Sequence, residues 1–312
     1  METLNYLIKR ILQVLPVLII VTILIFFMIR LIPGDPARVI LGEKATPEMV
    51  DLLREKMGLN KPIPVQYFIY MKNLFKFDLG NSIRYRIPVF ELIGKRFKVT
   101  IILTAFTVLF SIFLSLPLGY ISGIKKDKPQ DQIIRTAALV ALSMPQFWVG
   151  LILMILFSVK IKLFPVGGWG DTWPEHIRSI ILPTFTQALV TIALLARNLR
   201  NGVIDIVKLD YVDFARSKGL EENVVKKRHI IRNALLSYVT LISMRMAYML
   251  GGSIVVETVF ALPGIGALMI ESIYNRDYVV IQAVVLIFAF MVISVNILTD
   301  LAYVYLDPRV KL

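Results

Sequence analysis

Long apolar stretches with few or no charges limit what this 312-residue chain can fold into. A bilayer core about 30 Å thick needs a helix of roughly 20 apolar residues to cross it. Four uncharged runs approach or exceed that length, at residues 11–29, 99–124, 136–159 and 278–299. With 57% hydrophobic and 18% charged residues, the chain is also more apolar than an ordinary soluble domain. The sequence therefore predicts an all-α integral membrane protein.

Two weaker stretches bring the predicted number of transmembrane helices to six. The stretch at 179–196 carries Pro183 near its start, where a proline is best tolerated because the amides of the first helical turn lack helical partners. The stretch at 233–256 is interrupted only by Arg245. The six spans are expected at about residues 9–30, 99–124, 134–160, 179–200, 234–257 and 278–304.

The first span and the segment after it, residues 1–98, are expected to form one part of the chain, in which residues 31–98 make a long extracytoplasmic loop. Thr46 and Pro47 suit the start of a helix that ends near Gly58. An aromatic stripe follows, formed by Tyr67, Phe68, Tyr70, Leu74 and Phe75. Such stripes usually serve packing or lie at a membrane interface.

Residues 99–312 are expected to form the core domain, with the other five spans, a cytoplasmic loop at 201–232 and an outer segment at 258–276. The uncharged part of that outer segment, residues 258–270, is too short to span a bilayer. It contains the three turn-forming residues Pro263, Gly264 and Gly266. We therefore expect a re-entrant or surface helix pair there.

The charge distribution predicts the orientation in the membrane. The chain carries 35 Lys and Arg against 22 Asp and Glu, a net charge of +13, and basic residues gather in short cytoplasmic loops. They lie before span one (Lys9, Arg10), between spans two and three (Lys125, Lys126, Lys128), between spans four and five (nine residues within 197–232) and after span six (Arg309, Lys311). These regions fall on one side of six spans, so both termini are expected in the cytoplasm. The long outer loop is basic too, but loops of more than about 60 residues cross largely regardless of charge.

Several function classes are excluded by what the sequence lacks. It has no cysteine, and hence no disulfide, thiolate zinc site or cysteine nucleophile. It has no glycine-rich phosphate loop, so any ATP that drives it is bound by another chain. Its two histidines, His176 and His229, fall on opposite predicted sides of the membrane, as expected of loop residues rather than metal ligands. Carboxylates are scarce within the spans, which argues against proton-driven transport.

Charges inside a membrane are costly and usually functional, and three lie in or near the spans: Arg245, Glu257 and Asp300. Arg245 either faces a pathway or subunit interface, or serves the structure by snorkelling or by bonding a backbone carbonyl. Glu257 and Asp300 lie near span ends, where we expect them to reach water and to act in bundle packing rather than in substrate binding.

The cytoplasmic loop alternates apolar and charged residues at helical spacing between Asn201 and Arg228. Gly219 permits a left-handed helix stop, and Glu221 and Glu222 suit the amino end of a second helix. Amphipathic basic loops often rest on anionic lipid. Here acids interleave with the bases, which favours a docking surface for a protein partner.

The same loop resembles that of permeases in binding-protein-dependent ABC importers, whose motif reads Glu-Ala-Ala, three residues, then Gly. The chain has Asp213-Phe214-Ala215 followed by Gly219. The peptide and nickel branch of that family is also similar around this loop, at Asp210-Tyr211-Val212, Ala215-Arg216, Lys218-Gly219, Arg228-His229 and Arg232-Asn233-Ala234. Further matching stretches are Pro33-Gly34-Asp35-Pro36, Gly58-Leu59, Gln66-Tyr67, Asp78-Leu79-Gly80, Ser143-Met144-Pro145, Phe147-Trp148, Glu257-Thr258-Val259-Phe260, Pro263-Gly264-Ile265-Gly266, Arg276-Asp277-Tyr278 and Asp307-Pro308-Arg309.

This resemblance implies the type I ABC importer permease fold. A second homologous permease subunit would share the pathway, two ATP-binding subunits would hold ATP and Mg, and an extracytoplasmic solute-binding protein would deliver the solute. The chain itself would be no enzyme, would carry no cofactor, would bind no nucleic acid, and would lie in the lipid bilayer of a prokaryotic plasma (inner) membrane.

The resemblance also implies which residues act. Those of the ATPase-coupling loop are Asp210, Tyr211, Asp213, Phe214, Ala215, Lys218, Gly219 and Glu221. Among them, Phe214 and Ala215 are expected to face a cleft in the ATPase subunit. Candidate pathway or interface residues are Arg245, Glu257, Pro263, Gly264 and Gly266.

The expected solute is a dipeptide or oligopeptide, with nickel chelates, glutathione and oligosaccharides as alternatives within the branch. An exporter or channel subunit built on the same bundle is a rival reading, against which the loop motif and the Pro-Gly-Ile-Gly pattern favour import. A membrane-embedded enzyme using Asp35, Asp78 and Asp171 is a remote alternative, because turn aspartates are common and these three share no catalytic spacing.

Overall fold

The computed structural model describes residues 2–30, 36–41, 45–56 and 58–306. Within them the chain is all-helical, as predicted, apart from loops and one isolated β-bridge between Asn81 and Pro88. It divides into two compact units, one made of Thr3–Lys98 with Leu268–Phe290, the other of Val99–Ala267 with the chain from Met291 onward. The matched stretches Pro33-Gly34-Asp35 and Asp307-Pro308-Arg309, with Arg309 and Lys311, lie outside the described residues.

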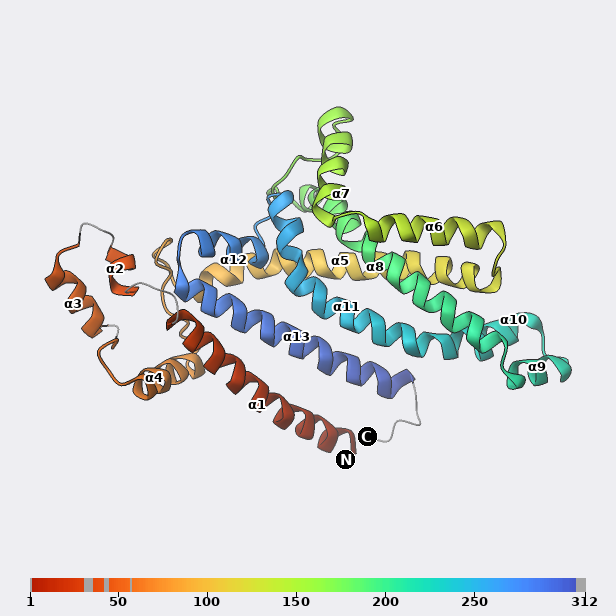
Figure 1. The fold of residues 1–312 in the computed structure, drawn as a ribbon, viewed down its shortest axis with the longest axis horizontal. Helices are drawn as coiled ribbons and strands as arrows, with labels where there is room; N and C mark the ends of the chain where they lie inside the picture. The colour runs from red at the N-terminus through yellow and green to blue at the C-terminus, as the bar shows by residue number, and fades with distance from the viewer. Residues whose placement is uncertain (1, 31–35, 42–44, 57, 307–312) are drawn as a thin grey trace. The chain divides into compact units, whose positions relative to one another are not determined.

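The helices before the second predicted span are α1 (Glu2–Arg30), α2 (Pro36–Leu41), α3 (Pro47–Lys56) and α4 (Ile63–Phe75) (Figure 1). α3 confirms the helix predicted from its cap. The Thr46 hydroxyl oxygen accepts a hydrogen bond from the Met49 amide at 3.4 Å, and the chain turns at Gly58, where φ is +66°.

α4 carries the aromatic stripe, which serves two purposes. Tyr67 and Tyr70 pack on Phe26 of α1, with ring centroids 5.2 and 5.9 Å away. Phe68 and Phe75 instead point outward, 69% and 80% exposed. Part of the stripe therefore packs within this unit and part is free to meet lipid or another chain.

The remaining helices are α5 (Val89–Ile124), α6 (Pro129–Ser143), α7 (Gln146–Leu153), the π-helix η1 (Met154–Lys160), α8 (Trp173–Val207), α9 (Asp210–Ser217), α10 (Glu222–Val224), the π-helix η2 (Val225–Ile231), α11 (Arg232–Val259), α12 (Ile265–Tyr274) and α13 (Tyr278–Leu306). Four helical segments of the described chain are long and apolar enough to cross a membrane: Val89–Ile124, Trp173–Val207, Glu222–Gly251 and Tyr278–Thr299. A bent pair, Pro129–Ser143 with Gln146–Lys160, makes a fifth if it counts as one span. The described apolar part of α1, Leu15–Met28, is shorter.

The span predicted at 134–160 is not one straight helix. α6 and the helix after it are bent by 101°, and the backbone between them is extended, with ψ of 129° at Met144 and 133° at Pro145. A proline has no amide hydrogen and disfavours helical backbone at the residue before it. Pro145 therefore breaks a run that hydropathy alone treats as continuous.

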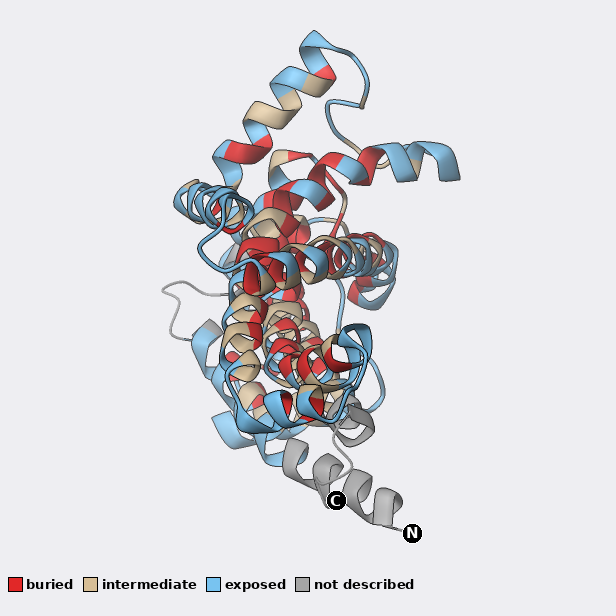
Figure 2. Cartoon of the chain, turned by 90° about the vertical axis from the view of Figure 1, so that its right-hand side faces the viewer, coloured by how far each residue is buried: buried red, intermediate tan, exposed pale blue. Residues whose placement is uncertain are grey.

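α8 is longer than predicted at both ends. It begins at a capping box, in which the Thr172 amide donates to Glu175 Oε2 at 3.2 Å, and it continues through residues 201–207, which were expected to be loop. Pro183 consequently lies inside the helix, so its predicted place in the first turn was wrong. Of the apolar core of α8, 72% is buried inside the chain, against 33% to 44% for the other three long spans. α8 is thus the central helix of its unit, in contact with α6, α7 and α11, and Figure 2 shows how burial varies along the chain.

Two glycines on one face of α5 let α8 approach closely. A Cβ atom at Gly119 would stand 2.7 Å from the Ala196 carbonyl oxygen, and one at Gly123 would stand 2.7 Å from the Val203 Cβ. A glycine pair spaced four residues apart is a common way to bring two membrane helices together. This spacing fixes α5 against the central helix.

Asp277, in the first unit, ties the segment just after the Asp78-Leu79-Gly80 stretch to the start of α13. Its carboxylate lies at the start of α13, 3.4 Å from the Val280 amide. It also accepts hydrogen bonds from the Ser82 hydroxyl at 2.5 Å and the Arg84 amide at 3.1 Å. Asp277 is 1% exposed, so these bonds hold the loop after Gly80 against the start of the last helix.

Candidate functional site

The loop that was expected to dock a partner is centred on α9, a short helix with two different faces. Val212 and Ala215 are 0% and 5% exposed and belong to the apolar core formed with α8, η2 and α11. Tyr211 and Phe214 are 40% and 60% exposed on the other face. The spacing of three residues within each pair places its members on one side of a helix. The prediction that Ala215 faces outward with Phe214 was therefore wrong.

A hydrogen-bond network ties the exposed face of α9 to the helix that follows. The Tyr211 hydroxyl donates to the His229 carbonyl oxygen at 3.1 Å. The Asn233 side-chain amide donates to the Tyr211 hydroxyl at 2.9 Å and to the same carbonyl at 2.7 Å. Residues from three separate motif segments meet here, and their contact was not predicted from the sequence.

Gly219 ends α9 in the way that the sequence predicted. Its φ is +78°, its amide donates to the Arg216 carbonyl at 2.9 Å, and the Leu220 amide donates to the Ala215 carbonyl at 3.4 Å. This pair of bonds is the Schellman arrangement, in which a left-handed residue follows the helix. No atom lies within 4 Å of a Cβ placed on Gly219, so the glycine is required by backbone conformation and not by space.

Charged side chains brace the turn after α9. Arg216 lies 3.2 Å from Asp213 and 3.3 Å from Glu222, and the hydrogen bonding that Arg216 donates to the Glu222 carboxylate is the main cause that raises the pKa of Arg216. The Lys218 ammonium stands 4.5 Å from the centre of the Phe214 ring. The remaining predicted residues of the loop, Asp210 and Glu221, are exposed. The outer surface of α9 is thus an exposed aromatic ring set among charges of both signs.

The loop itself is shorter than the predicted range of 201–232. Residues 201–207 belong to α8, and helical backbone resumes at Glu222 and continues through η2 into α11. Only the stretch between Val207 and Glu222 therefore stands apart from the long helices. The second helix that was expected after Gly219 is the beginning of the fifth predicted span.

Glu257 is fully buried, so the prediction that it reaches water was wrong. Its carboxylate accepts hydrogen bonds from the Thr100 hydroxyl at 2.7 Å and the Ala267 amide at 2.9 Å. Thr100 in turn accepts from the Ile265 amide at 2.9 Å. The first amides of a helix lack helical partners and attract negative charge. Glu257 of α11 therefore caps α12, with help from α5.

The turn before α12 contains the three other predicted residues of this region. Pro263 is half-buried, and Gly264 and Gly266 are buried. A Cβ on Gly264 would overlap the Glu257 carboxylate, and one on Gly266 would stand 2.7 Å from the Ile254 Cα. The small residues make room for the cap. A single helix follows the turn where a helix pair was expected.

Arg245 stands apart from these contacts. Its guanidinium lies 5.5 Å from the ring of Tyr248, which is 66% exposed, and it makes no hydrogen bond or ion pair with the residues that the structure describes. The side chain of Asp300 is outside the described part. Within that part, no cluster of three His, Asp or Glu side chains could hold a metal ion.

A buried ion pair between α6 and α8 is the feature that sequence reasoning missed. Arg200 donates two hydrogen bonds of 2.6 Å to the Asp131 carboxylate, which is 0% exposed. The carboxylate also accepts bonds from the Ser122 hydroxyl and, at 2.9 Å, from the Asp127 amide. Asp131 and Arg200 lie just outside the predicted apolar runs. Pairing them from the sequence would have required knowing which residues of the two spans lie at the same level.

Comparison with known proteins identifies this helical arrangement. Residues 115–312 match the family described as binding-protein-dependent transport system inner membrane component, and residues 3–104 match the N-terminal membrane component of the same systems. The chain belongs to this family of transport permeases. The permease is 38% identical over 308 residues to the glutathione transport system permease of Pectobacterium atrosepticum, covering 99% of each chain. It is 39% identical over 306 residues to a Brucella abortus permease named for a peptide transport system, covering 97% of this chain and 98% of the relative.

These relatives confirm the resemblance to the peptide and nickel branch of ABC importers. Solved structures agree on the fold of the permease. A chain of the inward-facing MetNI methionine ABC transporter has a TM-score of 0.57 at 16% identity and covers 69% of the permease and 96% of its own length. A chain of an amino acid ABC transporter has a TM-score of 0.53 at 18% identity, with coverage of 68% and 92%. The fold is therefore that of ABC importer permeases.

Proposed function

We propose that this permease forms, together with a second homologous permease, the membrane pathway of an ABC importer for peptides. The observation that carries the proposal is its full-length similarity to permeases named for glutathione and peptide transport. Glutathione is itself a tripeptide, so both names point to short peptides as the solute class. Nickel chelates and oligosaccharides are the alternatives within the branch.

The proposed topology has six spans with both termini in the cytoplasm of a prokaryotic inner membrane. α1 is the first span and the bent pair of α6 with α7 and η1 counts as one, which adds two to the four long apolar helices. The basic residues at 125–128 and 208–232 support a cytoplasmic position for the turn between α5 and α6 and for α9 with its flanking turns. The segments at 31–98 and 258–276 lie outside, and the second of these re-enters the membrane.

In this proposal α9 couples the pathway to the ATPases. Two ATP-binding subunits hold ATP and Mg, and an extracytoplasmic solute-binding protein delivers the peptide. The exposed Phe214 and Tyr211 seat α9 in a cleft of one ATPase subunit. The buried Val212 and Ala215 pack on α8, η2 and α11, so a movement of α9 reaches the spans through packed side chains. Alternating access needs an element with two stable positions, and α9 with the helices it contacts supplies one.

Arg245 faces the pathway or the second permease. Arg245 has no ionic partner among the residues that the structure describes, and such a cation is costly in lipid and is usually directed toward a cavity or another subunit. The position of Arg245 beside the exposed Tyr248 ring supports this direction.

The test is a substitution at Gly219 in the assembled, reconstituted importer. Gly219→Val forces a β-branched residue to φ of +78°, which costs about 1–2 kcal/mol locally. Gly168→Val is the matched control, because Gly168 has φ of +89°, also has no atom within 4 Å of its Cβ position, and lies far from the loop in sequence. We expect peptide uptake, and the rise in ATPase activity on adding loaded binding protein, to fall in the Gly219 variant alone.

Two results would contradict the proposal. If the Gly219 variant assembles and couples ATP hydrolysis to uptake at the parental rate, α9 is an ordinary surface helix. If the parental complex shows no binding-protein-dependent uptake of any di-, tri- or oligopeptide in a mixture, while a nickel chelate or an oligosaccharide is taken up, the peptide assignment is wrong.

A further inference from the structure

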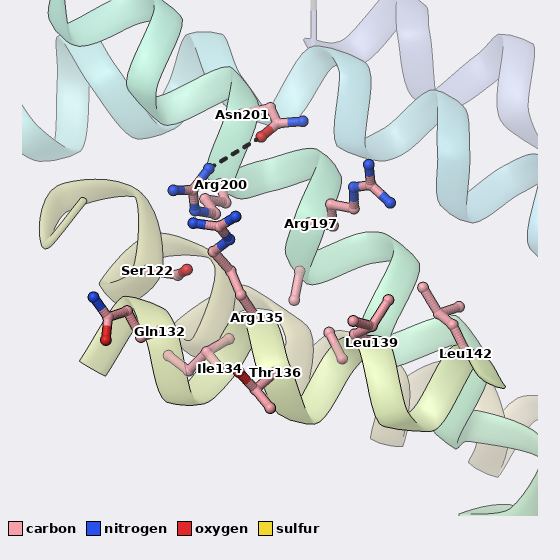
Figure 3. Close-up of a pocket in the computed structure, with 12 residues that line it drawn as sticks. Ser122, Gln132, Ile134, Arg135, Thr136, Leu139, Leu142, Arg197, Arg200 and Asn201 are labelled. Atoms are coloured by element: carbon pink, nitrogen blue, oxygen red, sulfur yellow. Dashed lines mark hydrogen bonds between the residues drawn. The ribbon is translucent and has the colours of Figure 1, made fainter. Parts of the chain in front are cut away.

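A cavity of about 620 Å³ lies between α6 and α8, beside the Asp131–Arg200 pair. Arg135 of α6 lines it together with Arg197, Arg200 and Asn201 of α8. Figure 3 shows the Arg135 side chain extending from α6 toward α8. Positions 197, 200 and 201 share one face of α8 because residues three and four apart are neighbours on a helix.

The positive charge of this cavity is only partly balanced. Arg200 is matched by the two hydrogen bonds to Asp131. In the part of the chain that the structure describes, no acidic side chain pairs with Arg135 or Arg197. Arg135 and Arg197 are both exposed rather than enclosed by the chain, so an anion that contacts the two guanidinium groups would balance their charge.

The cavity also changes character along its length. Leu139 and Leu142 line it one to two turns further along α6 than Arg135. On the neighbouring face of α6, a second hollow of about 650 Å³ is mainly apolar, with Ile133 and Val140 among its lining residues. A charged end followed by apolar side chains along a membrane helix matches the headgroup and the acyl chain of a phospholipid.

We propose that this cavity binds an anionic phospholipid, whose phosphate is held by Arg135 and Arg197 and whose acyl chain lies along Leu139 and Leu142. Arginine suits phosphate because its planar fork donates two parallel hydrogen bonds. Basic pockets between membrane helices near the cytoplasmic side are a known type of lipid headgroup site. A soluble anion would use the arginines but leave the leucines without a partner. The bound lipid would brace α6 against the central helix, whichever solute the importer carries.

The test compares two double variants of the purified, complete importer. Arg135→Gln/Arg197→Gln removes both unpaired charges, and Lys125→Gln/Lys126→Gln removes two charges that lie near the same end of α6 but outside the cavity. Retained phosphatidylglycerol is measured by native mass spectrometry. Thermal stabilisation is measured with phosphatidylglycerol, with phosphatidylethanolamine and with inorganic phosphate. A basic residue beside an anionic headgroup contributes about a fivefold change in affinity, so we expect phosphatidylglycerol binding to weaken roughly twentyfold in the arginine variant and little in the lysine variant.

Three outcomes would overturn the proposal. In the first, the arginine variant retains as much phosphatidylglycerol as the parent. In the second, inorganic phosphate stabilises the parent as well as the lipid does. In the third, a cysteine at position 139 cross-links to the second permease, which means that protein fills the cavity. Should the arginine variant fail to assemble, a photoactivatable phosphatidylglycerol added to the parent decides. Labelling of residues 129–143 and 196–201 supports the lipid site, and labelling confined to other helices refutes it.

Discussion

The side-chain amide of Asn233 donates a hydrogen bond of 2.9 Å to the Tyr211 hydroxyl, which links α9 to the first turn of α11. The same hydroxyl reaches the His229 carbonyl at 3.1 Å. Apolar packing of Val212 and Ala215 holds the inner face of α9, but these polar bonds reach its outer face. The loop helix is therefore attached on both faces to the chain that follows it, through η2 and α11.

Removing the Tyr211 hydroxyl should weaken coupling without preventing assembly. Tyr211→Phe deletes two hydrogen bonds at a half-exposed site, each of which contributes about 1 kcal/mol, while Asn233 keeps its bond of 2.7 Å to His229. We expect a lower ratio of peptide transported to ATP hydrolysed. Tyr274→Phe serves as the control because Tyr274 is 84% exposed. An unchanged ratio in the Tyr211 variant would show that the link is dispensable.

Substitutions on the two faces of α9 should have different effects. Phe214→Asp changes a side chain that is 60% exposed, and we expect normal assembly of the permeases but loss of ATPase binding or coupling. Ala215→Asp puts a carboxylate at a position that is 5% exposed, where an unpaired polar group costs several kcal/mol. We expect this variant to lose thermal stability before any partner is added. Size-exclusion chromatography of the permease pair with and without the ATPases separates the two effects, and equal behaviour of both variants would refute the two-face description.

The sequence predicted some of these features because their causes are local. Gly219 fixed the end of α9, and Thr46 with Pro47 fixed the start of α3, since capping and backbone conformation depend on neighbouring residues. The bend at Pro145 was also local, but the hydropathy of the run concealed it. The predictions that Ala215 faces outward and that Glu257 reaches water were wrong, because the burial of these two residues depends on distant segments. Tertiary packing determines which residues of α11 and α5 meet the start of α12, and which face of α9 is covered. One sequence does not display that packing.

The buried pair of Asp131 and Arg200 should be important for stability. Asp131→Asn leaves the guanidinium of Arg200, whose side chain is 13% exposed, without its counter-charge. Breaking a buried pair from one side typically costs about 3–5 kcal/mol. Asp131→Leu/Arg200→Met removes both charges and should recover a large part of that loss, since no charge is then left buried alone. Thermal unfolding of the detergent-purified complex measures both variants. If the double variant loses as much stability as Asp131→Leu and Arg200→Met lose in total when measured singly, the two residues do not stabilise each other as a pair.

The proposed orientation can be tested directly because the chain contains no cysteine. A cysteine at the exposed Lys61 should react with a membrane-impermeant maleimide added to intact cells or spheroplasts, because residues 31–98 are placed outside. A cysteine at the exposed Lys126 should react only after permeabilisation, because the basic turn between α5 and α6 is placed in the cytoplasm. Replacing one lysine at each site removes one positive charge in both cases, so each variant controls for the charge change in the other. Transport by both variants confirms that the labelled protein is correctly inserted. Labelling of Lys61→Cys only after permeabilisation, with immediate labelling of Lys126→Cys, would invert the topology and would place α9 on the outer face, where no ATPase could reach it.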